Sequence, residues 1–128
     1  MKRKKIGDFG EKIACFYLKN KGYEILDRNY SRKWLSGPQK GEIDIVVKKD
    51  KIISFIEVKT IASAQDGGYL PEDKVNFQKQ KQIKKISQDW LVAKKIPLES
   101  KWQIDIISIK VNLNTKKAKI RHLKNAIC

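Results

Sequence analysis

The chain has 128 residues, the length of one domain, and this is enough to bury a core without disulfides or a structural metal. Its 41% hydrophobic and 34% charged residues argue against wholesale disorder, and no run approaches the ~20 apolar residues of a membrane span. The 29 Lys and Arg residues outnumber 14 Asp and Glu residues, and the formal net charge of +15 favours a polyanionic partner, most often nucleic acid, over an anionic membrane surface or the ribosome.

The numbers of histidine and cysteine residues limit which metal sites the chain can form. His122 is the single histidine, and Cys15 and Cys128 are the two cysteines, without CxxC spacing. Multi-histidine metal centres and cysteine-based zinc sites are therefore excluded. Asp8 and Glu11 follow the basic N-terminal residues where a signal peptide would be apolar, so we expect a cytoplasmic protein without a secretion signal.

Residues 6–20 have the apolar period of a helix. One apolar row consists of Phe9, Ile13, Phe16 and Tyr17, with Ala14 and Leu18 beside it. This pattern predicts that the row faces the core. Glu11 lies at the border of the apolar arc, so its carboxylate is half-buried against a partner group, aimed at a site, or an ordinary surface group.

The pattern of residues 23–30, which follow this helix, predicts a strand. Residues 31–40 form a loop rich in basic and turn-forming residues, and this loop carries Trp34. An aromatic side chain among cations can stack on an unpaired base, and packing of Trp34 under its own loop is the alternative.

Two runs rich in β-branched residues, 41–47 and 53–59, predict antiparallel strands. The residues between them are polar, and we expect a four-residue loop at 48–51. If that loop contains no bulge, Val47 pairs with Ile52. The rest of the register follows from this pair.

The register places three carboxylates on one face of the hairpin. Glu42 is opposite Glu57, and Asp44 is opposite Phe55 and a diagonal neighbour of Glu57, at roughly 7–8 Å. Lys59 adds an ammonium group to the same face. Like charges so close favour a divalent cation such as magnesium, because hard cations bind carboxylate oxygens. The alternative is an exposed sheet end with solvated charges.

Residues 60–73 read as a crossover loop, either a lid near the carboxylates or a plain connector. Residues 74–95 predict a long helix. Its buried stripe is expected to consist of Ile83, Ile86, Trp90 and Ala93, and lysines on the other faces could contact phosphates. Strands at 102–109 and 119–123 complete the order α-β-β-β-α-β-β. We therefore expect residues 1–128 to form a single α/β domain with a mixed sheet flanked by helices.

Six short motifs in this order resemble those of a known family. They are Gly10-Glu11, Gly41-Glu42-Ile43-Asp44, Glu57-Val58-Lys59, Lys79-Gln80, Ile104-Asp105, and His122 with Asn125-Ala126-Ile127. The chain is similar over its whole length to the YraN-like family, a branch of the PD-(D/E)XK nuclease superfamily whose core is similar to that of archaeal Holliday-junction resolvases. The resemblance implies a restriction-endonuclease-like fold and, by analogy with resolvases, a homodimer.

The resemblance also implies roles for individual residues. Asp44, Glu57 and the Val58 carbonyl would bind magnesium, for which manganese could substitute. The implied catalytic residues are Glu11, Asp44, Glu57, Lys59 and Gln80: Glu11 would orient the metal or its water, Lys59 would stabilise the charge on phosphorus, and Gln80 would reach toward the site from its helix. Ile61 and Gln103 stand where many relatives carry arginine, and this affects substrate contacts more than metal binding.

The expected activity is metal-dependent endonucleolytic hydrolysis of phosphodiester bonds in structured or damaged DNA, as in a junction resolvase. The alternative is a non-catalytic nucleic-acid-binding module on the same fold. In either case we expect nucleic acid, DNA in particular, to be the partner, and no membrane. Its contacts are expected from Lys4, Lys5, Arg32, Lys33, Trp34, Lys79 and Lys81.

Overall fold

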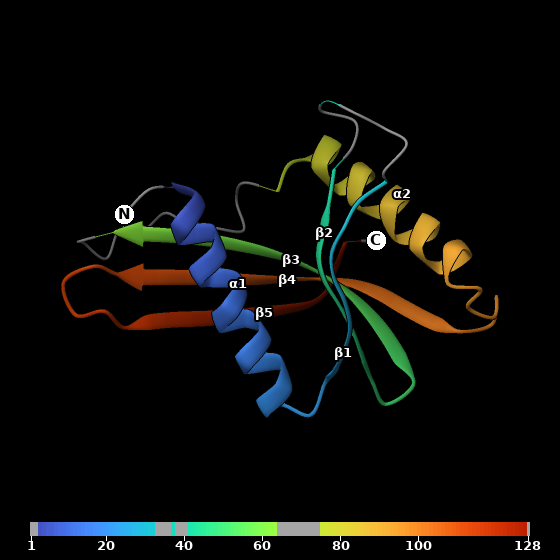
Figure 1. The fold of residues 1–128 in the computed structure, drawn as a ribbon, viewed down its shortest axis with the longest axis horizontal. Coiled ribbons are helices and arrows are strands. Elements are labelled where there is room, and N and C mark those ends of the chain that lie inside the picture. The colour runs from blue at the N-terminus through green and yellow to red at the C-terminus, as the bar shows by residue number, and fades with distance from the viewer. Residues whose placement is uncertain (1–2, 33–36, 38–40, 64–74, 128) are drawn as a thin grey trace.

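A computed structural model describes residues 3–32, 37, 41–63 and 75–127 of the protein (Figure 1). Within them the elements are α1 (Arg3–Asn20), β1 (Glu24–Tyr30), β2 (Ile43–Lys49), β3 (Ile52–Ser63), α2 (Phe77–Ala93), β4 (Lys101–Asn112) and β5 (Ala118–Ile127). The predicted order of helices and strands is confirmed. Strands β3, β4 and β5 are longer than expected, and β3 takes up the first residues of the predicted crossover loop, the rest of which lies outside the described residues.

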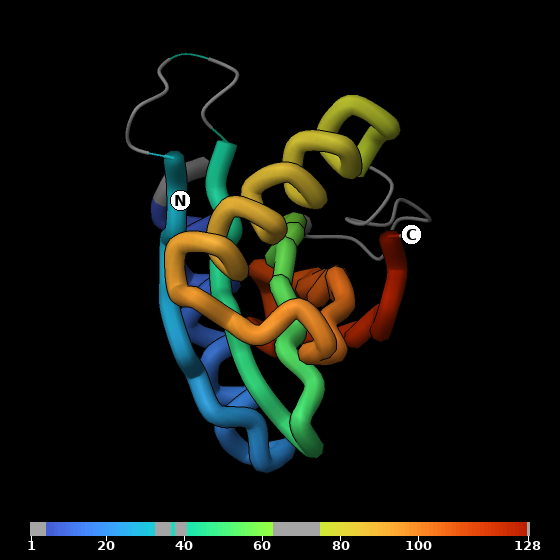
Figure 2. Tube along the Cα trace, turned by 90° about the vertical axis from the view of Figure 1, so that its right-hand side faces the viewer, coloured from blue at the N-terminus to red at the C-terminus, as the bar shows by residue number. Residues whose placement is uncertain are grey.

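The five strands form one mixed sheet in the order β1-β2-β3-β4-β5. Neighbouring strands are antiparallel except for β3 and β4, which are parallel. Parallel neighbours need a long crossover connection, and α2 lies within this one. The two helices cover opposite faces of the sheet (Figures 1 and 2).

The core is divided between these two faces because alternate strand residues point to opposite sides. On β2, Val46 packs in the cluster beneath α2, whereas Ile45 and Val47 pack in the cluster beneath α1. The expected buried stripe of α2 is confirmed at Ile83, Ile86 and Trp90. Its fourth member, Ala93, is exposed, because α2 ends at that residue.

The predicted orientation of α1 is correct only in part. Ala14 and Leu18 are buried and Ile13 and Tyr17 pack against the same cluster, but Phe9 and Phe16 are 42% and 69% exposed, and Gly10 is buried against the sheet. The reason is close packing on β3: a Cβ atom added at Gly10 would lie 1.9 Å from the Thr60 Oγ1. Small side chains allow this approach, and the larger aromatic residues are left outside.

The predicted register of the β2–β3 hairpin is wrong by two residues. Lys49 pairs with Ile52, and only Asp50 and Lys51 form the turn. Both turn residues have positive φ, 52° and 66°, as the two central residues of a type I′ turn do. Because the offset is even, it does not exchange the two faces of the paired residues, and Val46 still faces away from Ile45 and Val47. The corrected register ends with Ile45 opposite Ile56, and Asp44 and Glu57 are the residues next to this pair on the two strands.

No helix among the described residues is long and apolar enough to cross a bilayer.

Candidate metal centre

Three carboxylates from two segments of the chain, α1 and the start of β2, lie close together. Glu11 comes from α1, Glu42 immediately precedes β2, and Asp44 is the second residue of that strand. One carboxylate oxygen of each residue lies within 4.8 Å of the other two. All three side chains are partly buried. This is a hard oxygen donor set of the kind that magnesium, manganese or calcium binds.

Asn29 joins two of these carboxylates. Its Nδ2 donates to the Glu11 Oε1 at 2.9 Å and to the Glu42 Oε1 at 2.7 Å. The residue has φ 52°, in the left-handed region that asparagine tolerates better than most residues. Sequence reasoning missed Asn29, because nothing in its strand pattern indicates that it meets residues 18 positions before and 13 positions after it.

Asp44 is held at the junction of β2 and β3. Its Oδ2 accepts a hydrogen bond from the Val58 backbone N–H at 2.7 Å. Burial, and next the nearby Glu57 carboxylate, raise the pKa of Asp44 to about 8. Without a cation the site therefore favours a proton on this carboxyl group.

Glu57 is 3% exposed and lies between two lysines. Its Oε1 is 3.3 Å from the Lys59 Nζ and 3.7 Å from the Lys79 Nζ. Burial raises the pKa of Glu57, although the two ammonium groups act in the opposite direction. Its second oxygen, Oε2, is buried without a hydrogen-bond partner among the described residues. A buried carboxylate oxygen left without a donor is costly unless a cation or a water meets it.

These observations fit a divalent cation. The carboxylates supply hard oxygen ligands, the raised pKa of Asp44 is what a bound cation would lower, and the Glu57 Oε2 has no donor among the described residues. The group differs from the set expected by resemblance, because it joins Glu11 and Glu42 to Asp44 and leaves Glu57 adjacent. Val58 contacts Asp44 through its backbone N–H. A metal bond to the Val58 carbonyl stays a prediction.

The other predicted site residues are distributed differently. Gln80 bonds through its Nε2 to the Val75 carbonyl at 3.1 Å, and its neighbour Lys79 is the α2 residue that contacts Glu57. The catalytic role of Gln80 stays a prediction.

The residues expected to contact nucleic acid lie in several places. Lys5 and Lys81 are exposed, and the Lys81 Nζ is 4.7 Å from the Phe77 ring centroid. Arg32 forms an ion pair with Asp89 at 3.4 Å. Lys33, Trp34 and the side chain of Lys4 lie outside the described residues.

A second polar network lies where β4, β5 and α1 meet. Asp105, 0% exposed, accepts hydrogen bonds from the Gln103 Nε2 and the Asn125 N–H, both at 2.9 Å. Its other oxygen is 2.8 Å from the His122 Nε2, and the His122 Nδ1 is 3.1 Å from the Tyr17 hydroxyl. This network satisfies a buried carboxylate and ties α1 to β5, which is a structural role.

The comparisons with known proteins agree over nearly the whole chain. The sequence model of a family described as "Uncharacterised protein family UPF0102" matches residues 10–109. A UPF0102 protein of Alkaliphilus oremlandii (strain OhILAs) is 44% identical over 123 residues, covering 96% of this chain and 97% of that protein. A UPF0102 protein of Clostridium botulinum (strain 657 / Type Ba4) is 40% identical over 123 residues, covering 96% and 94%.

Proposed function

The chain belongs to the uncharacterised protein family UPF0102, and we propose that it is a metal-dependent endonuclease of the PD-(D/E)XK type that hydrolyses phosphodiester bonds in DNA. One observation carries the proposal: three carboxylates converge within 4.8 Å beside Glu57 and its two lysines, in a protein of net charge +15. Carboxylates concentrated on a basic protein suit a reaction that needs a bound cation and a polyanionic substrate.

Glu11, Glu42 and Asp44 would hold the cation, with Glu57 adjoining them. The bound cation supplies Lewis acidity at the scissile phosphate and lowers the pKa of a water. Asn29 orients Glu11 and Glu42 by its two hydrogen bonds.

Lys59 and Lys79, the two lysines that contact Glu57, would bind phosphate groups of the substrate. The Lys59 ammonium, 3.3 Å from the Glu57 Oε1, is positioned to donate to a phosphate oxygen, where negative charge increases in the transition state. Lys79, on the other side of the same carboxylate, would contact a neighbouring phosphate.

DNA with a branch, flap, nick or damaged site is the substrate class that we propose, and a cytoplasmic location and a dimer belong to the same proposal. Support comes from the charge of the chain and from its resemblance to nucleases with a resolvase-like core.

Cleavage of a DNA panel tests the activity. We expect purified protein with Mg²⁺ or Mn²⁺ to cut at least one of a set of branched, flapped, nicked and single-stranded DNAs. Asp44→Ala and Lys59→Ala should each abolish cleavage while leaving DNA binding nearly unchanged. Asp50→Asn and Lys48→Ala, exposed changes on the same hairpin, are the matched controls and should cut normally.

A non-catalytic nucleic-acid-binding module is the second candidate, favoured by the +15 charge, which by itself explains binding. Titration calorimetry separates the two. The nuclease requires that Mn²⁺ bind wild type and bind Asp44→Asn at least tenfold more weakly. Tight DNA binding with no Mn²⁺ binding and no cleavage would establish the module instead.

A further inference from the structure

Two members of the apolar row of α1, Phe9 and Phe16, lie on the surface, whereas Ile13 and Tyr17 pack partly against the core. Phe9 and Phe16 are 42% and 69% exposed, and Ile120 of the neighbouring strand β5 is 37% exposed. Large apolar side chains gathered in this way on a protein surface often mark a binding site. The carboxylate site does not involve them.

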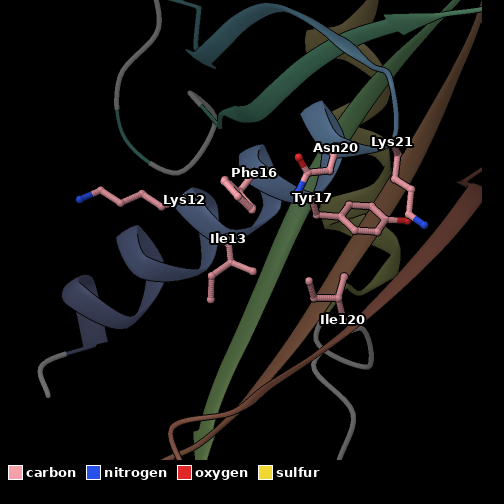
Figure 3. A pocket seen from close by; sticks show the side chains of 7 residues that line it. All are labelled: Lys12, Ile13, Phe16, Tyr17, Asn20, Lys21 and Ile120. Atoms are coloured by element: carbon pink, nitrogen blue, oxygen red, sulfur yellow. The ribbon is translucent and has the colours of Figure 1, made fainter.

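Phe16 and Ile120 contribute to a pocket of about 590 Å³ between α1 and β5 (Figure 3). Its apolar lining consists of Ile13, Phe16, Tyr17 and Ile120. The volume lies within the usual range for ligand pockets, ~300–1,000 Å³. Tyr17 contributes its ring, because its hydroxyl lies 3.1 Å from the His122 Nδ1.

The rim of the pocket is basic. Lys12, Asn20 and Lys21 complete the lining made by the described residues, none of which is acidic. In Figure 3 the two lysines lie at opposite ends of the apolar group. No ion pair joins either lysine to another described residue, and the Lys21 Nζ lies 6.0 Å from the Tyr17 ring centroid. Both ammonium groups can therefore meet a ligand that carries negative charge on either side of an apolar centre.

We propose that this pocket binds an acidic linear segment of a partner protein, which inserts an aromatic or large aliphatic side chain against Phe16 and pairs its carboxylates with Lys12 and Lys21. The mode is that of a short peptide anchored by one buried side chain. Acidic flanks complement the rim and are attracted by the net charge of +15.

Two other occupants fit less well. A second copy of the chain would bring another molecule of charge +15 to a basic rim. An unpaired base has polar edges that need partners, and this lining offers few uncharged polar groups besides the Asn20 amide.

Selection from a phage-displayed library of random decapeptides tests the proposal on the full-length protein. We expect the enriched peptides to place Asp or Glu around an aromatic or large aliphatic residue. A labelled copy of such a peptide should bind wild type, and by fluorescence anisotropy Phe16→Ser and the pair Lys12→Glu/Lys21→Glu should each weaken it at least tenfold. Phe16 is largely exposed, so folding should survive, which circular dichroism checks.

Matched controls lie on α2. Phe77→Ser removes an aromatic side chain that is 68% exposed, and Lys85→Glu reverses an exposed charge; both should bind the peptide within twofold of wild type. The proposal is overturned if no peptide is enriched, or if Phe16→Ser leaves peptide binding intact. It is also overturned if Phe16→Ser abolishes self-association in sedimentation, or if it weakens single-stranded DNA binding tenfold.

Discussion

Asn29 is a single residue that holds two carboxylates of the proposed metal site in place before any cation binds. Two carboxylates that repel each other are held by one amide, through hydrogen bonds of 2.9 and 2.7 Å to Glu11 and Glu42. The positive φ of 52° restricts the residues that can occupy this position. Asparagine meets both demands, because it tolerates the left-handed backbone and carries two N–H donors.

Replacing this amide should weaken metal binding. We expect Asn29→Gly, which keeps the backbone unstrained, to reduce Mn²⁺ affinity by roughly tenfold or more, because such supporting contacts typically matter by 10–100-fold. Asn29→Ala should lose the same affinity and in addition about 1 kcal/mol of folding stability from the left-handed backbone. Titration calorimetry and urea unfolding measure the two effects, and a wild-type affinity for Asn29→Gly would contradict this role.

Asp44 makes the stability of the metal-free protein depend on pH. Its pKa is raised from 3.8 to about 8 on folding, so the folded state binds the proton more tightly than the unfolded chain does. The contribution of Asp44 to the free energy of unfolding is therefore greatest below pH 4, and it falls as the pH rises from about 4 to 8. Glu57, whose pKa is also raised, adds to the same trend.

Asp44→Asn should flatten this dependence. With EDTA present, we expect the variant to exceed wild type in unfolding free energy by several kcal/mol at pH 8 and to match it near pH 4, because each unit of raised pKa corresponds to about 1.4 kcal/mol. Urea unfolding at several pH values gives the comparison, with Asp50→Asn in the exposed turn as control. Parallel pH profiles for wild type and Asp44→Asn would rule out a buried, proton-binding Asp44.

Among the elements, α1 approaches β3 through its small residues, while Phe9 and Phe16 stay exposed. Periodicity identified an apolar row, but Gly10 and Ala14 decide which side approaches β3 most closely. The same arrangement directs Glu11 toward Asn29 and Asp44. The packing of one glycine thus positions a member of the proposed metal site.

The substitution Gly10→Ala, which adds one methyl group, tests this close packing. Gly10→Ala puts a Cβ atom 1.9 Å from the Thr60 Oγ1, and we expect a loss of roughly 1–3 kcal/mol in unfolding free energy by urea titration. Gly7→Ala, in the same helix with nothing within 4 Å, should instead gain about 0.5–1 kcal/mol from helix propensity. Equal effects of the two changes would argue against close packing as the cause.

The whole molecule combines a strongly basic chain with a small acidic centre. The parallel pairing of β3 and β4 requires a crossover, and the helix within it brings Lys79 to Glu57 from 22 positions further along the chain. Cations therefore reach the acidic centre from both the sheet and α2. The remaining positive charge is available for a long polyanion.

Duplex binding should depend steeply on salt. If six or more phosphates are neutralised, affinity should fall about a thousandfold between 50 and 200 mM salt, with log K decreasing by about 0.9 per phosphate for each unit of log salt. Fluorescence anisotropy with a labelled duplex in EDTA measures the slope, and Asp44→Asn should leave it unchanged. A slope corresponding to one or two phosphates would contradict an extended nucleic-acid surface.

The sequence by itself determined the order of elements, the buried stripe of α2 and the face of the hairpin that carries Asp44 and Glu57, because side-chain period is a local property of the backbone. The prediction of this face was unaffected by the two-residue error in register, because an even shift does not exchange the two faces of a strand. Only the tertiary structure decided that Glu11, Glu42 and Asn29 meet and that the Phe16 face of α1 stays uncovered. Those outcomes depend on how closely two surfaces approach, which no periodicity within one segment encodes.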